Sequence, residues 1–479
     1  MSTELDVDLA VIGFGKGGKT LAAALAKRGR RVVLIEQSAA MYGGTCINIG
    51  CVPTKSMVYR AESLPDGGPH RSAYTEAVAA TAGITAELRT INYAMLDNLD
   101  AATVLTGHAR FLDPHRLAVQ LSDGGTVTVT ARWIVIGTGS RPVLPDIPGL
   151  ADSPRVYTST DLLAHRQLPE RLVVLGGGYV GLEFAGMYAA YGSTVTVLER
   201  GEQLLAREDP DIAECTAQIL SAAGVSIVTG AEVSSVTDGR VEYRDADGAH
   251  QSAADAVLVA LGREPVTDGL DLAAAGVATT EHGAVAVDEH LRTSRPHIFA
   301  VGDVNGGPQF TYISLDDYRV VLSQLIGDGS RSTATRSAVP YALFTTPPLA
   351  RVGLTATAAT AAGHRIKVAS LQVKDMVTMP RARIVSQTAG TMKVVVDSDT
   401  DRILGAALLC HDAHEVINTV ALAMRHVITA TELRDSIYTH PSMTEGFNQL
   451  LGALQTEPPD GPGAVAEQRT ARPTGSPPS

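Results

Sequence analysis

Two cysteines separated by four residues, Cys46 and Cys51, are the clearest candidates for chemistry in the sequence (GGTCINIGCVPTK). A disulfide needs Cα atoms about 4.4–6.8 Å apart, whereas five steps of regular helix rise about 7.5 Å and turn the side chains to different faces. The backbone between them therefore cannot be regular helix if they bond, and Gly50 gives it freedom to depart. Pro53 is typical of the first turn of a helix, which would begin just after Cys51.

A cysteine at such a helix N-terminus has a lowered thiol pKa, and we expect an exposed, easily reduced disulfide. The alternatives are a metal clip or two inert thiols. A clip needs further soft ligands, but the sequence holds only two other cysteines and no second cysteine cluster. Cys215 lies in an apolar helical pattern typical of packing. The CHDAHE segment has ligand types suited to copper or zinc, yet it follows a strand pattern and opens a helix, where such side chains are commonly solvated (Cys410, His411, His414, Glu415). We expect redox chemistry at the first pair and no metal site.

Two glycine-rich turns follow apolar, strand-like runs and precede Ala- and Leu-rich helical patterns. Each fits G-x-G-x-x-G, and each is followed by a second strand pattern that ends in a glutamate. Such glycines let the backbone approach a pyrophosphate at a helix N-terminus, and the acid can accept hydrogen bonds from a ribose diol. Two copies predict two dinucleotides and electron transfer between them. The first copy is Gly13, Gly15, Gly18 and Glu36, and the second is Gly176, Gly178, Gly181 and Glu199.

The 479 residues are enough for about three folded units, and a strand-and-helix texture from about Val339 indicates a third, α+β domain. A net charge of −12 argues against nucleic acid or anionic lipid as the main partner. No apolar run approaches the ~20 residues that span a bilayer, and the N-terminal residues enter a strand pattern at once. We therefore expect a soluble, cytoplasmic protein with no membrane partner. The Pro- and Gly-rich segment 456–479 is expected to be a disordered tail.

Seven motifs occur in an order that resembles the class I pyridine nucleotide–disulfide oxidoreductases, the flavin-dependent group of dihydrolipoamide dehydrogenase, glutathione reductase and mercuric reductase. They are GFGKGG, GGTCINIGCVPTK, IGTGSRP, GGGYVGLEFA, ALGREP, FAVGDV and HPSMTE. Within this group the sequence is most similar to the reactive chlorine resistance oxidoreductases, through GFGKGGKTLA, EQSAAMYGGTCINIGC, QFTYISLDDYR, LFTTPPLARVG and PRARI.

The resemblance implies an α/β fold with two Rossmann-like dinucleotide-binding domains, one for FAD and one for NAD, and a C-terminal α+β dimerisation domain. The expected boundaries are 1–155 with 270–336 for the FAD-binding domain, 156–269 for the NAD(P)-binding domain and 337–455 for the dimerisation domain. It also implies a homodimer in which the active site is shared between subunits.

The resemblance assigns roles to individual residues. Cys51 would contact the flavin and Cys46 would meet the substrate, while Lys55 and Glu183 match a pair beside the flavin. His440 would be the acid/base and Glu445 its orienting carboxylate. The first glycine turn with Glu36 would bind FAD, Asp303 its ribityl chain, and the second turn with Glu199 the nicotinamide nucleotide. The same motifs add further cofactor-binding positions: Gly44, Thr45, Thr138, Gly139 and Gly262.

Glu199 favours NADH over NADPH, because a carboxylate repels a 2′-phosphate, although the adjacent Arg200 could soften this preference. No cysteine follows Cys410, so the C-terminal pair with which mercuric reductases and high-molecular-weight thioredoxin reductases act is not present. The stretch QFTYISLDDYR departs from dihydrolipoamide dehydrogenase; Tyr312 and the acids Asp316 and Asp317 would lie near the flavin or on a helix surface.

Three hypotheses remain. The first is an NAD(P)H-dependent oxidoreductase that reduces a small-molecule or metal-ion acceptor, such as Cu(II) or hypothiocyanous acid, where the acceptors come from the resemblance. The second is a dihydrolipoamide dehydrogenase or another low-molecular-weight disulfide reductase. The third is a flavin-binding redox sensor without turnover, against which the His440 and Glu445 pair argues, since a sensor needs no proton delivery.

Overall fold

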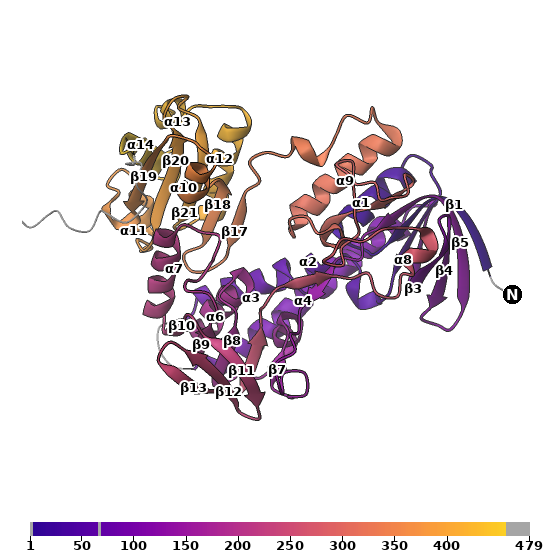
Figure 1. Ribbon diagram of the computed structural model, residues 1–479, viewed down its shortest axis with the longest axis horizontal. Helices are drawn as coiled ribbons and strands as arrows, with labels where there is room; N and C mark the ends of the chain where they lie inside the picture. The colour runs from indigo at the N-terminus through magenta and orange to yellow at the C-terminus, as the bar shows by residue number, and fades with distance from the viewer. Residues whose placement is uncertain (1–2, 66–68, 457–479) are drawn as a thin grey trace, which may run out of the picture. The chain divides into compact units, whose positions relative to one another are not determined.

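The computed structural model describes residues 3–65 and 69–456 (Figure 1). The chain divides into two compact units, Met1–Leu349 and Ala350–Ser479. Across the described ranges, the helices are too short or too polar to cross a membrane. The predicted tail lies outside the described residues except for Thr456, which pairs with Lys367 at the end of the chain's last strand.

The first sheet of the N-terminal unit has parallel strands at its centre and an antiparallel meander at one end. Strand β1 pairs in parallel with β2 and with β5, and β16 extends the sheet beyond β5. Strand β4 pairs antiparallel with both β3 and β5. The bounds are β1 Thr3–Ile12, β2 Val32–Glu36, β3 Ala102–Asp113, β4 Arg116–Leu121, β5 Thr126–Ile136 and β16 Ile298–Ala300.

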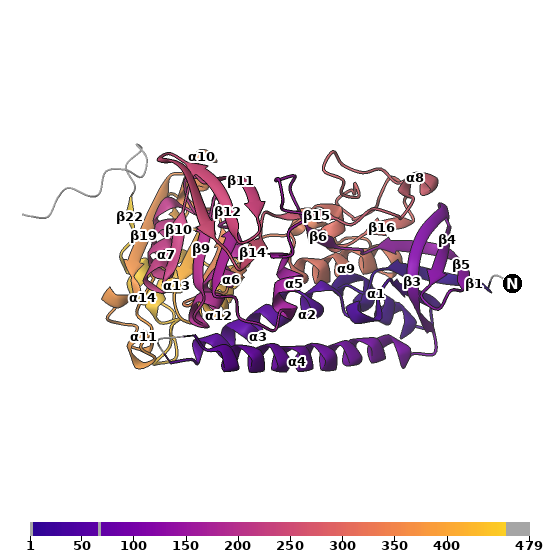
Figure 2. The same ribbon diagram turned by 90° about the horizontal axis from the view of Figure 1, so that it is seen from below.

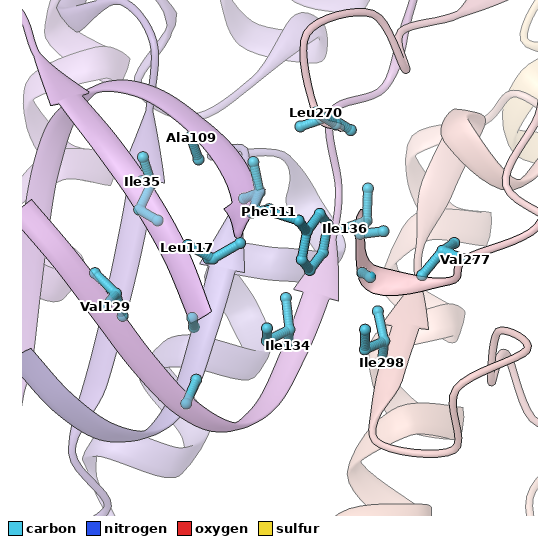
Figure 3. Packing of buried hydrophobic residues seen from close by; sticks show 14 of the residues in the cluster. Ile35, Ala109, Phe111, Leu117, Val129, Ile134, Ile136, Leu270, Val277 and Ile298 are labelled. Atoms are coloured by element: carbon cyan, nitrogen blue, oxygen red, sulfur yellow. The ribbon is translucent and has the colours of Figure 1, made fainter. Parts of the chain in front are cut away.

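Both faces of the sheet are buried at its parallel centre, which explains why β2, β16 and the last residues of β1 and β5 are nearly continuous apolar runs. The antiparallel strand β4 instead alternates buried and more exposed residues. Alternate side chains of β1 enter two different cores: Ala10 and Ile12 one, Leu9 and Val11 the other. Figure 3 shows the first core, where side chains from the strands pack against Leu270, Val277 and their neighbours. Helices α1 (Lys16–Ala26) and α9 (Thr311–Ile326) contribute to the second core.

Helices α1 and α9 approach each other so closely that only glycine fits at position 17. A Cβ there would lie 2.6 Å from the carbonyl oxygen of Ser314. The Ser314 hydroxyl accepts a hydrogen bond from Gly17 N at 3.0 Å. The long helix α4 (Arg71–Asp97) lies along α2 (Thr45–Asn48) and α3 (Cys51–Glu62), as Figure 2 shows. These contacts set the framework around the cysteine motif. Shorter elements of this region are η1 Ala39–Met41, α8 Leu272–Ala275, η2 Gly302–Asn305, η3 Thr333–Thr335 and β17 Tyr341–Leu343.

A second parallel sheet is formed between residues 156 and 259, in the order β10-β9-β8-β14-β7. It carries helices α5 (Ser159–Ala164), α6 (Tyr179–Ala190) and α7 (Pro210–Ala222). An antiparallel sheet, β11-β12-β13, and a two-stranded ladder, β6 with β15, complete the region. The bounds are β6 Ser140–Pro142, β7 Val156–Tyr157, β8 Arg171–Leu175, β9 Thr194–Leu198, β10 Val225–Val228, β11 Glu232–Thr237, β12 Arg240–Asp245, β13 Gly248–Ala253, β14 Ala256–Val259 and β15 Arg263–Pro265.

The C-terminal unit is built on an antiparallel ladder in which β19 pairs with β20, β20 with β21, and β22 with β19. Its elements are β18 Leu349–Gly353, α10 Ala356–Ala361, β19 Ile366–Gln372, η4 Val373–Asp375, α11 Arg381–Ile384, β20 Thr391–Asp397, β21 Ile403–Leu409, α12 Ala413–Arg425, α13 Ala430–Arg434, α14 Gly446–Gly452 and β22 Gln455–Thr456. Two strand-helix-strand sheets followed by an α+β unit confirm the predicted fold class. The division of the first unit at residues 155 and 270 stays a prediction.

Candidate active site

The cysteine motif folds as two helices separated by a break. Helix α2 carries Cys46 and ends at Asn48, and α3 begins at Cys51. The backbone leaves the helical conformation at Gly50, where φ is −124° and ψ is −115°. The non-helical connection that a bond between the two cysteines would need is therefore present. The helix begins at Cys51 itself, one residue earlier than the predicted start just after it.

The two cysteines are free thiols in this structure, and their side chains form a hydrogen bond with each other. This hydrogen bond lowers the pKa of Cys51 to about 6, helped by Thr311 and by the positive charge of Lys55 against the opposing effect of burial. The same hydrogen bond raises the pKa of Cys46, and burial adds to the effect. At pH 7 the pair therefore holds a thiolate on Cys51 and a thiol on Cys46.

Thr311, the first residue of α9, is part of this arrangement, and the sequence analysis missed it. Its hydroxyl lies 3.7 Å from the sulfur of Cys51 and also bonds to Cys46. A hydroxyl can donate to a thiolate, so Thr311 stabilises the charge on Cys51. The signal available in the sequence was its place at the start of a helix that follows the GDV motif. Tyr312, next to it, instead donates its hydroxyl to the carbonyl oxygen of Pro340 at 2.5 Å.

Lys55 and Glu183, which match a pair of the family by sequence, form an ion pair in the structure. Their place beside a flavin stays a prediction. The Lys55 ammonium group lies 2.8 and 2.7 Å from the two carboxylate oxygens of Glu183. Lys55 is one turn beyond Cys51 on α3, and Glu183 is on α6. Glu183 is 8% exposed and also accepts the Phe344 N–H at 2.9 Å, while the Lys55 amine lies 4.8 Å from the centre of the Phe344 ring. This pair therefore sets a positive charge beside Cys51 and fixes it through a nearly buried carboxylate.

The first and third glycines of each turn are required by packing within the protein. Gly13 and Gly176 have φ of +102° and +106°, in the left-handed region that favours glycine. A Cβ would lie 2.3 Å from the Gly137 carbonyl oxygen at Gly13, and 2.6 Å from that of Ala260 at Gly176. At Gly181 it would lie 2.1 Å from the Gly176 oxygen, and at Gly18, 2.7 Å from a Val11 methyl group.

The middle glycines are different, because packing within the protein does not explain them. A Cβ at Gly178 would meet nothing within 4 Å, and one at Gly15 would make only an ordinary contact at 3.6 Å. These residues are the N-caps of α6 and α1, and neither helix has a side-chain cap or an acidic residue in its first turn. The Gly17 N–H on α1 donates to the Ser314 hydroxyl, but the dipole of each helix at this end still favours an anionic group such as a pyrophosphate.

The two glutamates at the strand ends hold their glycine turns. Glu36 accepts the Phe14 N–H at 3.0 Å, and Glu199 accepts the Gly177 N–H at 2.6 Å. Glu199 also accepts the Gly201 N–H at 2.6 Å with its other oxygen. Burial raises the pKa of Glu36, and its backbone hydrogen bonds oppose that effect. Each turn is therefore braced by a carboxylate.

Asp303 lies in η2 and is linked to the segment after β5. Its Oδ2 accepts a hydrogen bond from the Ser140 hydroxyl at 2.6 Å, and Arg263 donates to the hydroxyl and carbonyl oxygens of Ser140 at 2.9 and 2.6 Å. Among the described residues, nothing donates to Oδ1 of Asp303. Asp317, which is fully buried, accepts the Gly302 N–H at 2.6 Å and pairs with Arg336. Asp317 thus braces the turn that carries Asp303.

The remaining predicted cofactor-binding residues lie at the start of α2 and in the loops that follow β5 and β14. Gly44 packs directly on the first glycine turn, since a Cβ there would lie 2.6 Å from Cα of Gly15, and Thr45 begins α2. The Thr138 hydroxyl donates to the Val266 carbonyl oxygen at 2.5 Å, and Gly139 follows it with φ of +75°. Gly262 follows β14 with φ of +114°.

His440 and Glu445 lie in the C-terminal unit and form the predicted dyad. Nδ1 of His440 is 2.8 Å from Oε2 of Glu445, and Oε1 of Glu445 accepts the Ser442 N–H at 2.8 Å. The His440 side chain is 69% exposed, whereas Glu445 is 12% exposed. A carboxylate at Nδ1 favours the tautomer with its proton there, which leaves Nε2 free to exchange a proton.

The CHDAHE segment connects β21 to α12. Cys410 is fully buried, which raises its thiol pKa to about 12. His411 lies 2.9 Å from Oε1 of Gln387 and 3.2 Å from the adjacent Asp412. Over residues 3–65 and 69–456, His, Cys, Asp and Glu form no group of three or more that could hold a metal ion.

The pyridine nucleotide-disulphide oxidoreductase family matches residues 7–317, and the dimerisation domain of the same family matches residues 339–451. This chain belongs to that family. It is 46% identical over 445 residues to the probable pyridine nucleotide-disulfide oxidoreductase RclA of Escherichia coli K12, covering 93% of this chain and 98% of that protein. It is 38% identical to the mercuric reductase of Acidithiobacillus ferrooxidans, covering 93% of this chain and 82% of that one.

A solved structure, the Cu(II) complex of the HOCl-induced flavoprotein disulfide reductase RclA from E. coli, matches with a TM-score of 0.88 and 45% identity, covering 94% of this chain and 99% of that one. A pyridine nucleotide-disulphide oxidoreductase is an NAD(P)H-dependent enzyme that uses a flavin and a nicotinamide cofactor. The helix N-termini at Gly15 and Gly178, which have no acidic residue in the first turn, fit the pyrophosphate groups of these two cofactors. The predicted family resemblance is thereby confirmed.

Proposed function

We propose that the enzyme passes two electrons from NADH, through FAD, to a Cys46–Cys51 disulfide and from there to a small oxidised acceptor. The observation that carries this proposal is the hydrogen-bonded cysteine pair, whose charge is held on Cys51 by Thr311 and Lys55. When bound, the flavin accepts a hydride from the nicotinamide and delivers the electron pair to the disulfide. Uptake of two electrons and one proton leaves the Cys51 thiolate and the Cys46 thiol.

Cys46 must lose its proton before it can attack the acceptor, because the thiolate is the nucleophile. We propose that His440 of the partner subunit accepts this proton at Nε2, while Glu445 of the partner subunit holds the ring through Nδ1. The same histidine, now protonated, returns the proton to the leaving group. Cys51 thiolate then displaces what remains on Cys46, which restores the disulfide and leaves the acceptor reduced by two electrons. This requires a homodimer, for which the dimerisation domain is the supporting observation.

Each of the two glycine-rich turns is proposed to bind one dinucleotide. The first, with Glu36 and Asp303, is proposed to hold FAD, and the second, with Glu199, to hold NADH. Both carboxylate oxygens of Glu199 accept backbone hydrogen bonds, which keeps a negative charge fixed where NADPH would place a 2′-phosphate. We therefore expect kcat/KM for NADH to exceed that for NADPH, and Glu199→Gln to narrow the difference.

The acceptor is proposed to be Cu(II) or a reactive chlorine-type oxidant such as hypothiocyanous acid. Support comes from the relative RclA, which is described as induced by HOCl and was solved as a Cu(II) complex. Hypothiocyanous acid balances as a two-electron acceptor that yields thiocyanate and water, and two Cu(II) ions would yield two Cu(I). Because mercuric reductases are also relatives, Hg(II) belongs among the acceptors to be compared.

Steady-state NADH oxidation should be measured in parallel with Cu(II), hypothiocyanite, Hg(II), lipoamide and glutathione disulfide. We expect the first two to give the highest kcat/KM. A preference for lipoamide by orders of magnitude would identify a disulfide reductase instead, and no turnover with any acceptor, despite bound FAD, would favour a sensor. Cys46→Ser should retain reducible flavin and lose turnover, whereas the control Cys215→Ser, on α7, should match the wild type. Unchanged turnover in Cys46→Ser would exclude the cysteine mechanism.

A further inference from the structure

Lys19 is a buried amine that the proposed mechanism does not use. It follows the third glycine of the first turn and lies on α1, and only 4% of the residue is exposed. A lysine is seldom buried to this degree, because removing an ammonium group from water is costly unless polar partners replace the lost hydration. The position of Lys19 therefore calls for a physical explanation.

The amine of Lys19 connects three elements. It donates to the carbonyl oxygen of Gly43 at 3.1 Å and to the side-chain oxygen of Asn92 on α4. Gly43 is in the turn that leads into α2, the helix of Cys46. Asn92 is itself held by a hydrogen bond from its Nδ2 to the Leu88 carbonyl oxygen at 2.7 Å. Lys19 thus fixes the start of the cysteine helix to the cofactor-binding helix and to α4.

The turn that Lys19 holds has little room to move. Gly43 and Gly44 both have positive φ, at +99° and +79°. A Cβ on Gly43 would lie 2.1 Å from the Ile47 side chain, and one on Gly44 would lie 2.6 Å from Cα of Gly15. A displacement at Gly43 would therefore be passed to the helix that carries Cys46.

Both hydrogen-bond acceptors of Lys19 are neutral oxygens, so its charge is not cancelled by a carboxylate in direct contact. Burial, together with the nearby charge of Lys16, lowers the pKa of Lys19 to about 8, and the amine still carries its proton at pH 7. Its charge acts on Cys46, whose thiol pKa it lowers against the larger opposing effects of Cys51 and burial. A positive charge in a poorly solvated region acts over a longer range than one in water.

We propose that Lys19 is a positioning residue for the redox pair: it anchors the turn that presents Cys46 and supplies a fixed positive charge that favours the Cys46 thiolate. This inference rests on the proposed role of Cys46 as the thiol that meets the acceptor. It assigns a function to the second lysine of the GFGKGGKTLA segment, one of the passages on which the subfamily resemblance depends.

The test is the alkylation rate of Cys46 at pH 7 in reduced enzyme, with dithiothreitol removed and the modified residue identified by peptide mapping. Lys19→Met removes the charge and both hydrogen bonds. We expect it to bind FAD and to slow Cys46 alkylation about three- to tenfold, since a loss of up to one pKa unit of stabilisation lowers the thiolate fraction up to tenfold. Lys27→Met, an exposed lysine that caps the same helix, is the matched control and should react as the wild type does.

A second variant separates the charge from the anchor. Asn92→Asp keeps the shape and the hydrogen bond from Lys19, although it loses the one from Nδ2 to the Leu88 carbonyl oxygen. It places a carboxylate against the ammonium group, so it should also slow alkylation of Cys46. Unchanged alkylation rates in both variants would overturn the proposal, and so would loss of FAD from both, because Lys19 would then serve the cofactor site alone. The alkylation measurements need no electron acceptor. They can therefore fail independently of the proposed function, which is tested by the turnover of Cys46→Ser.

Discussion

The hydroxyl of Thr311 lies 3.7 Å from the sulfur of Cys51, although 260 positions separate the two residues in the chain. The contact forms because α9 begins beside the break between α2 and α3. It joins a helix from the end of the first unit's sequence to the cysteine motif near its beginning. The chemistry proposed for Cys46 and Cys51 depends on such neighbouring groups, because they stabilise a thiolate on Cys51 rather than on Cys46.

Thr311→Val should raise the pKa of Cys51 above its value of about 6. Valine keeps the shape of threonine and removes the hydroxyl that bonds to the thiolate, a loss of about 1 kcal/mol or somewhat less than one pKa unit. An absorbance titration of the thiolate-to-flavin charge-transfer band in reduced enzyme would measure this shift. Thr90→Val, an exposed threonine on α4, is the control. An unchanged midpoint would mean that Thr311 does not stabilise the thiolate.

The charge-transfer band should also disappear in acid. The pKa of Cys51 is lowered from 9.0 to about 6, so the thiolate is fully formed well above pH 6 and is lost as the pH falls through that value. The band of the reduced wild-type enzyme should therefore be at full strength at pH 8 and about half strength near pH 6. A band that is lost only around pH 9 would show that the pair does not lower the pKa of Cys51.

Lys55→Met should destabilise the protein and weaken the thiolate. It leaves the nearly buried Glu183 carboxylate without its cation, which costs about 1–3 kcal/mol for a pair whose lysine is partly exposed. It also removes a positive charge that lowers the pKa of Cys51. Thermal unfolding and the charge-transfer titration would measure the two effects. The double variant Lys55→Met/Glu183→Gln should recover part of the stability and, because the Glu183 charge raises the pKa of Cys51, part of the lowered pKa as well. Stability and pKa that both stay as in Lys55→Met would contradict this account.

Gly176→Ala should lower the stability of the protein, whereas Gly178→Ala should lower its affinity for the nucleotide. At Gly176, positive φ and a Cβ only 2.6 Å from a carbonyl oxygen predict a loss of about 1–3 kcal/mol of stability. At Gly178 the added methyl group meets nothing within 4 Å, so Tm should stay close to that of the wild type while nucleotide affinity falls about tenfold or more. Tm and the Kd for NADH, measured on both variants, test this. Normal affinity in Gly178→Ala would mean that the open helix N-terminus is not the nucleotide site.

Features that are local in the sequence were predictable. Glycine spacing, the glutamate at the end of the next strand and a proline two residues after Cys51 each report a backbone conformation within a few residues. The short apolar runs that begin at Ala256 and Ile298 have the pattern of buried strands, and they form β14 and β16. The run from Ala284 to Val287, however, is not a strand; it makes a single bridge, between Val285 and Thr279. Apolar side chains there serve a packed loop, which has the same local pattern as a short strand.

Features that depend on distant contacts were not predictable. Thr311 looks like an ordinary helical residue until α9 is placed against the cysteines, and Lys19 looks like an exposed lysine until α4 covers it. Asp317 shows the same limit. Its sequence context predicts a place near the flavin or on a helix surface, like that of Tyr312 and Asp316. The structure buries it beneath Gly302, where it braces a turn through a backbone N–H. Only tertiary packing distinguishes these uses of one side chain.

Glu36 and Glu199 should keep the two glycine turns in shape when no nucleotide cofactor is bound. Each carboxylate already grips a main-chain amide of its own loop, at Phe14 and Gly177, so the loops keep their shape without help from a nucleotide. Apoprotein from which the yellow FAD has been removed should therefore remain folded. It should regain its colour quickly when FAD is added back, because the binding loop needs no rearrangement.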